Sequence, residues 1–152
     1  MDTREIVHTL NDLIETCKNG EHGFSICAEQ AESLELKNLL ATRSSDCKHA
    51  ADELQTCVVR MGGEPEEHGT AAGAVHRGWV KLRAELSPKT DLAVLEECER
   101  GEDVALKHYR DALTHDLPHD VEALVQRQLL GAQANHDQIK MMRNQLRAQA
   151  RA

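Results

Sequence analysis

Apolar residues recur every three or four positions through four long stretches of this chain. This spacing places them along one face of an α-helix, as in a helix that packs against a core. The good helix formers Leu, Ala, Glu, Gln, Lys and Arg dominate the sequence. The pattern predicts an all-α protein with helices over residues 5–31, 34–61, 89–115 and 119–149.

The residues at the predicted helix ends suit these bounds. Asp2 and Glu5 have the spacing of a capping box at the start of the first helix. Ser33 is a favourable N-cap for the second helix, which Gly62 and the glycine after it would end. Pro88 favours a helix start just before the third stretch.

The connections between the predicted helices are short, long and short. The long one, residues 62–88, opens with the run GGEPEEHGTAAG, and a short helix over 70–86 would carry the only tryptophan, Trp79. Short connections join antiparallel neighbours, so we expect two hairpins joined by a long crossover in a four-helix bundle. A chain of 152 residues suits one domain with one core, and we assign residues 1–152 to it.

The charge balance argues against some partners and locations. The chain has 26 Asp and Glu residues against 18 Lys and Arg, a net charge of −8, which disfavours nucleic acid and anionic membranes. It has no apolar run of transmembrane length and no secretory signal pattern at its start. We therefore expect a cytoplasmic protein, with a homodimer as the default for a symmetric helical protein.

Five cysteines lie inside the helical stretches rather than in loops: Cys17, Cys27, Cys47, Cys57 and Cys98. An odd number in such positions indicates reduced thiols that pack as small apolar groups. Cys17 and Cys98 should face each other, and thiolates there could bind Cu(I) or Zn²⁺. No C-x-x-C pair supports this alternative.

The two predicted hairpins share a degenerate repeat. The motif C-x-x-G-E begins at Cys17 in the first helix and at Cys98 in the third. A polar residue stands three positions before His49 in the second helix and before His136 in the fourth. This reads as a duplication that gives the bundle approximate two-fold symmetry.

Two glutamates are predicted to point toward the core. Glu21 follows Cys17 by four positions and Glu102 follows Cys98 by four, so both continue an apolar stripe. Burying an unpaired carboxylate costs several kcal/mol or shifts its pKa strongly. We therefore expect a cation or strong hydrogen-bond donors beside both carboxylates.

The hairpin geometry supplies candidate partners for these glutamates. Reflection through the first turn brings the Asp46–His49 segment opposite Glu21, and reflection through the second brings Gln133–His136 opposite Glu102. Each pair spans one helical turn, so both of its side chains face the same way. The predicted metal site therefore comprises Glu21, Asp46, His49, Glu102, Gln133 and His136.

At these residues the chain resembles a known group. Glu on the first and third helices with D/E-x-x-H on the second and fourth is the ferritin-like di-iron carboxylate pattern. The segments GEHGF, DCKHAADEL, GTAAGAVHRGW and CERGEDVALKHY are similar to a bacterial family of ferritin-like four-helix bundles whose biochemical role is not established. The resemblance implies a ferritin-like fold and a metal site, with di-iron redox chemistry or iron handling under stress as its function.

The sequence departs from the di-iron pattern at Gln133, where a carboxylate is expected. Gln is neutral, which leaves three carboxylates in the set to balance two divalent ions. A weak, asymmetric or single-metal site follows, or a site that does not form. Glu53 and Glu99 lie close enough along their helices to replace the missing acid or to support the ligands.

Two functional classes follow from this pattern. Carboxylate and imidazole ligands suit iron, manganese or zinc, with iron favoured by the resemblance. The alternative is a non-enzymatic structural or interaction bundle, in which a Glu/His core is ion-paired without metal or pinned by zinc. The residues do not specify a reaction or a substrate.

Overall fold

A computed structural model of the chain describes residues 2–67, 79 and 90–151. The described residues contain four helices and confirm the predicted all-α fold. Each bound lies within three residues of the sequence prediction. The helices are α1 (Thr3–Gln30), α2 (Leu34–Arg60), α5 (Asp91–Ala112) and α6 (His119–Arg151).

Side-chain caps determine where the helices begin. Asp2 accepts a hydrogen bond from the Glu5 amide at 2.9 Å, and Glu5 accepts one from the Asp2 amide at 3.2 Å, which forms the predicted capping box. Ser33 caps α2, as expected. α5 begins two residues later than predicted because the hydroxyl of Thr90 caps it by accepting from the Ala93 amide.

Gly62 ends α2 as the sequence predicts. Its φ is +80°, in the left-handed region that glycine adopts without a steric penalty. The amide of Gly62 donates to the Val59 carbonyl and the amide of Gly63 donates to the Val58 carbonyl, each at 3.0 Å. This pair of bonds is a Schellman motif, which satisfies carbonyls that the helix end leaves open.

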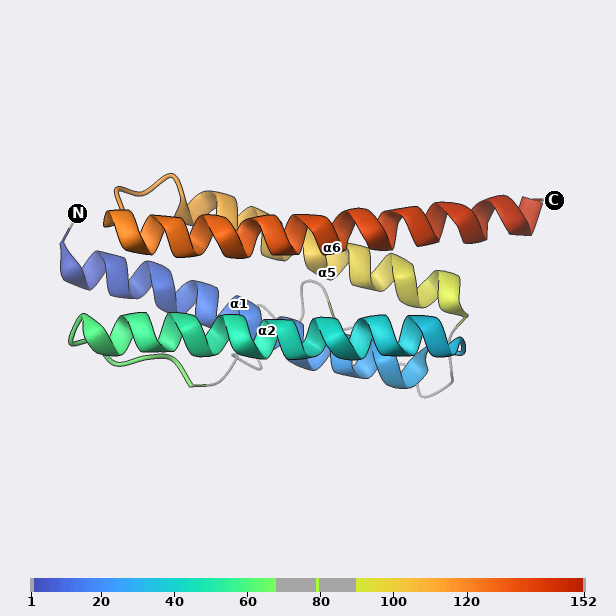
Figure 1. Ribbon diagram of the computed structural model, residues 1–152, viewed down its shortest axis with the longest axis horizontal. Helices are drawn as coiled ribbons and strands as arrows, with labels where there is room; N and C mark the ends of the chain where they lie inside the picture. Colours follow the sequence, from blue (N-terminus) through green and yellow to red (C-terminus); the bar gives the residue numbers. More distant parts are fainter. Residues whose placement is uncertain (1, 68–78, 80–89, 152) are drawn as a thin grey trace.

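The helices form two antiparallel hairpins, α1 with α2 and α5 with α6 (Figure 1). The two hairpins meet mainly where α1 packs against α5, whereas α2 and α6 have few contacts with each other. This uneven packing leaves space between α2 and α6 near the middle of the bundle, where the candidate site lies. No helix in the described part of the chain is both long enough and apolar enough to cross a membrane.

The core consists of two apolar clusters. One includes Leu10 of α1, Leu54 of α2 and Val125 of α6. The other includes Phe24 of α1 and Ile139 of α6. Polar and charged side chains lie near mid-height, where the stripes of α2 and α5 carry ionisable residues.

Trp79 joins the crossover to the second of these clusters. The predicted short helix over 70–86 lies outside the described residues except for this tryptophan, which is 5% exposed. Its ring meets Phe24 edge-on, with centroids 5.0 Å apart. A Cβ atom built on Gly23 or Gly101 would lie 2.2 Å from the indole. Glycine is therefore required on both helices for the ring to fit between them.

Candidate functional site

Glu102 is a buried carboxylate near the middle of the bundle, as predicted. It is 1% exposed, on the core face of α5 between Cys98 and Leu106. Arg43 Nη2 lies 3.1 Å from Glu102 Oε1, and Asn135 Nδ2 donates to the same oxygen at 3.3 Å. Burial raises the pKa of Glu102 above its ordinary value, while the Arg43 charge opposes that rise. The arginine is thus the cation that makes burial of this carboxylate tolerable.

Sequence reasoning missed Arg43, although the signal was present. Arg43 lies between Leu40 and Cys47 at spacings of three and four, on the buried stripe of α2. A charged residue in that place needs a partner for the same reason as Glu102 does. The Arg43 side chain is 12% exposed, and its guanidinium carbon lies 5.7 Å from the centre of the Phe24 ring.

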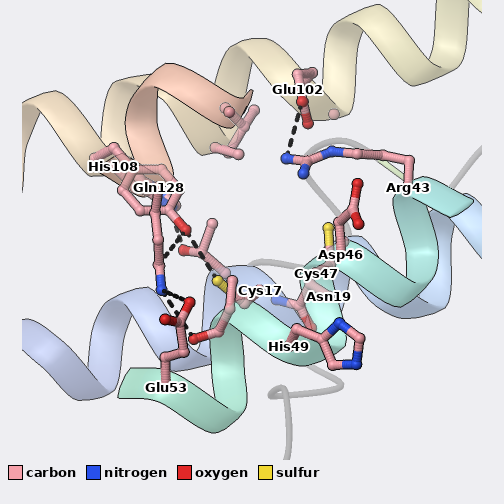
Figure 2. Close-up of a pocket in the computed structure, with 18 of the residues that line it drawn as sticks. Cys17, Asn19, Arg43, Asp46, Cys47, His49, Glu53, Glu102, His108 and Gln128 are labelled. Carbon is pink, nitrogen blue, oxygen red and sulfur yellow. Dashed lines mark hydrogen bonds and ion pairs between the residues drawn. The ribbon is translucent and has the colours of Figure 1, made fainter. Parts of the chain in front are cut away.

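A pocket of about 280 Å³ opens beside this ion pair, with walls from all four helices and Trp79 (Figure 2). Asp46 and His49 of α2 lie on its wall together with Glu102. Both α2 residues are exposed, and neither contacts Glu102 through a hydrogen bond or ion pair among the described residues. Three of the six predicted residues therefore border one pocket without closing around one point.

A hydrogen-bonded chain crosses the wall of this pocket. Tyr109 Oη lies 3.1 Å from Cys17 Sγ and donates to Gln128 Oε1 at 2.9 Å. Gln128 Nε2 in turn donates to the Ala50 carbonyl at 3.2 Å. Burial raises the pKa of Cys17 to about 11, so the thiol stays protonated at neutral pH.

Glu21 differs from its repeat partner Glu102. Gly20 takes the core position of α1 at this height, where an added Cβ would lie 3.0 Å from Cys47 Sγ. Glu21 lies one position to the side and is half-buried. Its Oε2 atom is enclosed and has no hydrogen-bond partner within the described part of the chain. The predicted inward direction holds for Glu102 and only partly for Glu21.

His136 of α6 faces α5 at the side of the bundle. Its Nε2 atom lies 2.6 Å from Asp103 Oδ1, and its side chain is 13% exposed. Glu99, one turn before Asp103, completes a group whose three donor atoms all lie within 4.8 Å of one another. Arg143 of α6 also contacts Glu99. We name Glu99, Asp103 and His136 the α5–α6 cluster.

Asp103 was missed in the sequence because it lies off the apolar stripe. Its spacing of four from Glu99 was the available signal, since residues four apart share a helix face. Gln133 lies elsewhere on α6: it accepts from Arg110 at 2.9 Å and donates to Asp137 at 3.0 Å. The expected support residue Glu53 pairs with Arg127 at 2.5 Å.

The structure therefore distributes the six predicted residues over different faces of the helices instead of gathering them around one point. Some border the central pocket, His136 belongs to the α5–α6 cluster, and Gln133 pairs with neighbouring polar groups. As placed, these donors do not fit a two-iron centre, because a guanidinium holds Glu102 and the Gln133 side chain is engaged elsewhere. The ligand assignment of the six-residue set remains a prediction.

Two solved structures share this fold. One is a conserved hypothetical protein, Rv2844, from Mycobacterium tuberculosis, with a TM-score of 0.75, 10% identity, and coverage of 93% of this chain and 99% of that chain. The other is a two-domain protein from Anabaena variabilis that contains DJ-1/ThiJ/PfpI-like and ferritin-like domains. Its TM-score is 0.78 at 12% identity, with 95% of this chain covered. The present chain spans only 40% of that protein.

These likenesses show a ferritin-like fold and confirm the predicted architecture. No curated protein matches the chain. Residues 5–115 match the family described as Domain of unknown function (DUF2383). That match covers most of the sequence, including α1, α2 and α5. The chain is a member of the DUF2383 family.

Proposed function

We propose that this protein is a ferritin-like metal-binding protein that holds one divalent cation at the α5–α6 cluster. The observation that carries the proposal is the approach of two carboxylates and one imidazole, with donor atoms within 4.8 Å of one another. Donors around one transition-metal ion, each about 2.1 Å from it, lie up to about 4 Å apart. Small side-chain rotations are enough to complete such a site.

The composition of the cluster indicates which ions suit it. Two carboxylates and a neutral imidazole are ligands that Fe(II), Mn(II) and Zn(II) accept. The ferritin-like fold makes Fe(II) the first candidate, with iron handling as the role, and one titration distinguishes it from the other two. A single ion at the side of the bundle matches the single-metal alternative that Gln133 suggested.

Arg143 competes with a metal ion for the carboxylate of Glu99. Its guanidinium contacts Glu99, so a metal ion must displace a positive charge to use that carboxylate. Binding is therefore weaker than the donor set alone would give. Replacing Arg143 with Gln removes this competition and is expected to raise metal affinity, whereas removing a ligand lowers it.

Metal titration of the wild type and a ligand variant tests the proposal. We expect protein purified without chelator to carry metal at up to one ion per chain by elemental analysis. Calorimetric titration with Fe(II) under anaerobic conditions, and with Mn(II) and Zn(II), should give one site. His136→Ala should weaken that site more than about tenfold, because one of three protein donors is lost.

His8→Ala is the matched control for this variant. His8 is exposed and lies 3.7 Å from Asp12, a His–Asp pair outside the α5–α6 cluster. Its removal should leave metal affinity unchanged. Equal losses in both variants would indicate adventitious binding to surface histidines and would contradict the proposed site. Adding Fe(II) in air while recording near-UV absorbance then tests whether the bound iron is oxidised.

A structural or interaction role without metal is the second candidate. The Glu102–Arg43 pair favours this candidate, because Glu102, the most deeply buried carboxylate among the described residues, already has a counter-charge. A bundle balanced in this way needs no ion for its core. Metal-free protein that takes up none of the three ions would support this candidate over the first, while uptake of zinc alone would support a zinc-pinned bundle.

A further inference from the structure

The central pocket beside Glu102 has two hydrogen-bond donors that lack a partner among the described residues. Asn19 is 5% exposed and lines the pocket, and its Nδ2 atom has no hydrogen-bond partner among the residues described. The Nε atom of Arg43 is likewise enclosed and unpartnered within those residues. By contrast, Tyr109 and Gln128 on the same wall donate to protein acceptors. These two donors therefore require a hydrogen-bond acceptor inside the pocket.

The shape of the pocket suits a small flat molecule. Its volume of about 280 Å³ exceeds the roughly 150 Å³ of an apolar cavity that accepts benzene. The indole of Trp79 contributes an aromatic surface to its lining. Both unpartnered residues are drawn in Figure 2 among the side chains around this space.

The charges around the pocket favour an uncharged ligand. Arg43 is paired with Glu102, and Arg127 with Glu53, so these four charges cancel. Asp46 adds a further negative charge on the lining. This excess of negative charge would repel an anion, although an anion could accept hydrogen bonds from the same two donors.

We propose that the pocket binds a small, uncharged, flat organic molecule whose carbonyl oxygen accepts hydrogen bonds from Asn19 and Arg43. This inference does not depend on the metal proposal, because the α5–α6 cluster shares no residue with the pocket lining. Residues of both α2 and α6 line the pocket, and these two helices have few contacts with each other in the described part of the chain. No chemical conversion of the ligand is implied.

Trp79 is the reporter for the test, since it is the only tryptophan of the chain and lines the pocket. The probes are benzamide, toluene and benzoate, titrated into the whole protein while Trp79 fluorescence is recorded. Benzamide should bind at least about tenfold more tightly than toluene, the equivalent of one good hydrogen bond. Benzoate should bind more weakly than benzamide because of the negative lining.

Asn19→Leu separates the hydrogen bond from the shape of the pocket. The variant should bind benzamide about tenfold more weakly than the wild type, with toluene binding retained. Asn38→Leu, at an exposed position of α2 outside the pocket, is the matched control and should change neither affinity. Far-UV circular dichroism of both variants establishes that the helices are intact.

Gly131→Leu is a second pocket variant, which tests the site even if Asn19→Leu does not fold. Gly131 lines the pocket, and a Cβ there meets no atom within 4 Å. The added side chain should therefore fold well and abolish the benzamide-induced fluorescence change by narrowing the pocket. Unchanged binding in this variant would overturn the proposed site.

The probe comparison has two further outcomes that overturn the inference. Equal affinity for benzamide and toluene would mean that the two donors are not used. No response to any probe, with Trp79 fluorescence unchanged, would mean that water alone satisfies Asn19 and Arg43. Selective benzamide binding that both pocket variants weaken supports the proposal.

Discussion

Replacing Arg43 with Met is expected to lower the free energy of unfolding by about 3–5 kcal/mol at neutral pH. The substitution removes the counter-charge of Glu102, which is 1% exposed, and leaves the carboxylate with Asn135 as its remaining hydrogen-bond donor among the described residues. The loss should be large because a buried carboxylate is left without its counter-charge. Urea denaturation followed by circular dichroism measures it.

A double variant serves as the control for the Arg43 experiment. Arg43→Met combined with Glu102→Leu removes both charges and fills the space with apolar atoms, so most of the lost stability should return. If the double variant is as unstable as Arg43→Met alone, the loss comes from packing of the arginine stem. The ion pair would then not be the reason for the instability.

The pH dependence of the Arg43→Met variant follows from the same pair. Burial raises the pKa of Glu102 in the folded state above its unfolded value, so the folded state binds more protons between those two values. Stability therefore falls as pH rises through this window, and removal of Arg43 extends the window upward. The destabilisation by Arg43→Met should shrink as the pH is lowered. A loss that is constant from acidic to neutral pH would contradict this.

Replacing Trp79 with Ala is expected to lower the free energy of unfolding by about 3–5 kcal/mol, the range for removing a large buried aromatic. The indole is 5% exposed and packs against Phe24 and between two glycines of α1 and α5. Its loss leaves a cavity where the crossover meets the bundle. Thermal and urea unfolding of the variant measure the change.

A pair of glycine variants checks that Trp79 occupies this position. Gly101→Ala should destabilise by about 1–3 kcal/mol through overpacking, because its Cβ would lie 2.2 Å from the indole. Gly131→Ala, also within a helix, meets no atom and should gain about 0.5–1 kcal/mol of helix propensity. Equal effects of the two substitutions would indicate that the ring does not lie against Gly101.

Interactions between residues close in the chain determine where the helices begin and end, and these positions were predictable from the sequence. The 3.6-residue period, the cap residues Asp2 and Ser33, and Gly62 at the end of α2 located the helices to within a few residues. The same period placed Glu102 in the core, because a side chain's direction from a helix depends only on its position along it. The lengths of the connections indicated the order of the hairpins.

The partners of the buried charges depended on the tertiary structure. A reflection through a hairpin turn estimates height along the bundle, but it does not give the rotation of one helix about its axis relative to the next. Glu102 therefore meets Arg43 and Asn135, while His136 faces Asp103 at the side of the bundle. Which side chains meet across helices is set by packing between residues far apart in sequence, and only the assembled bundle specifies it.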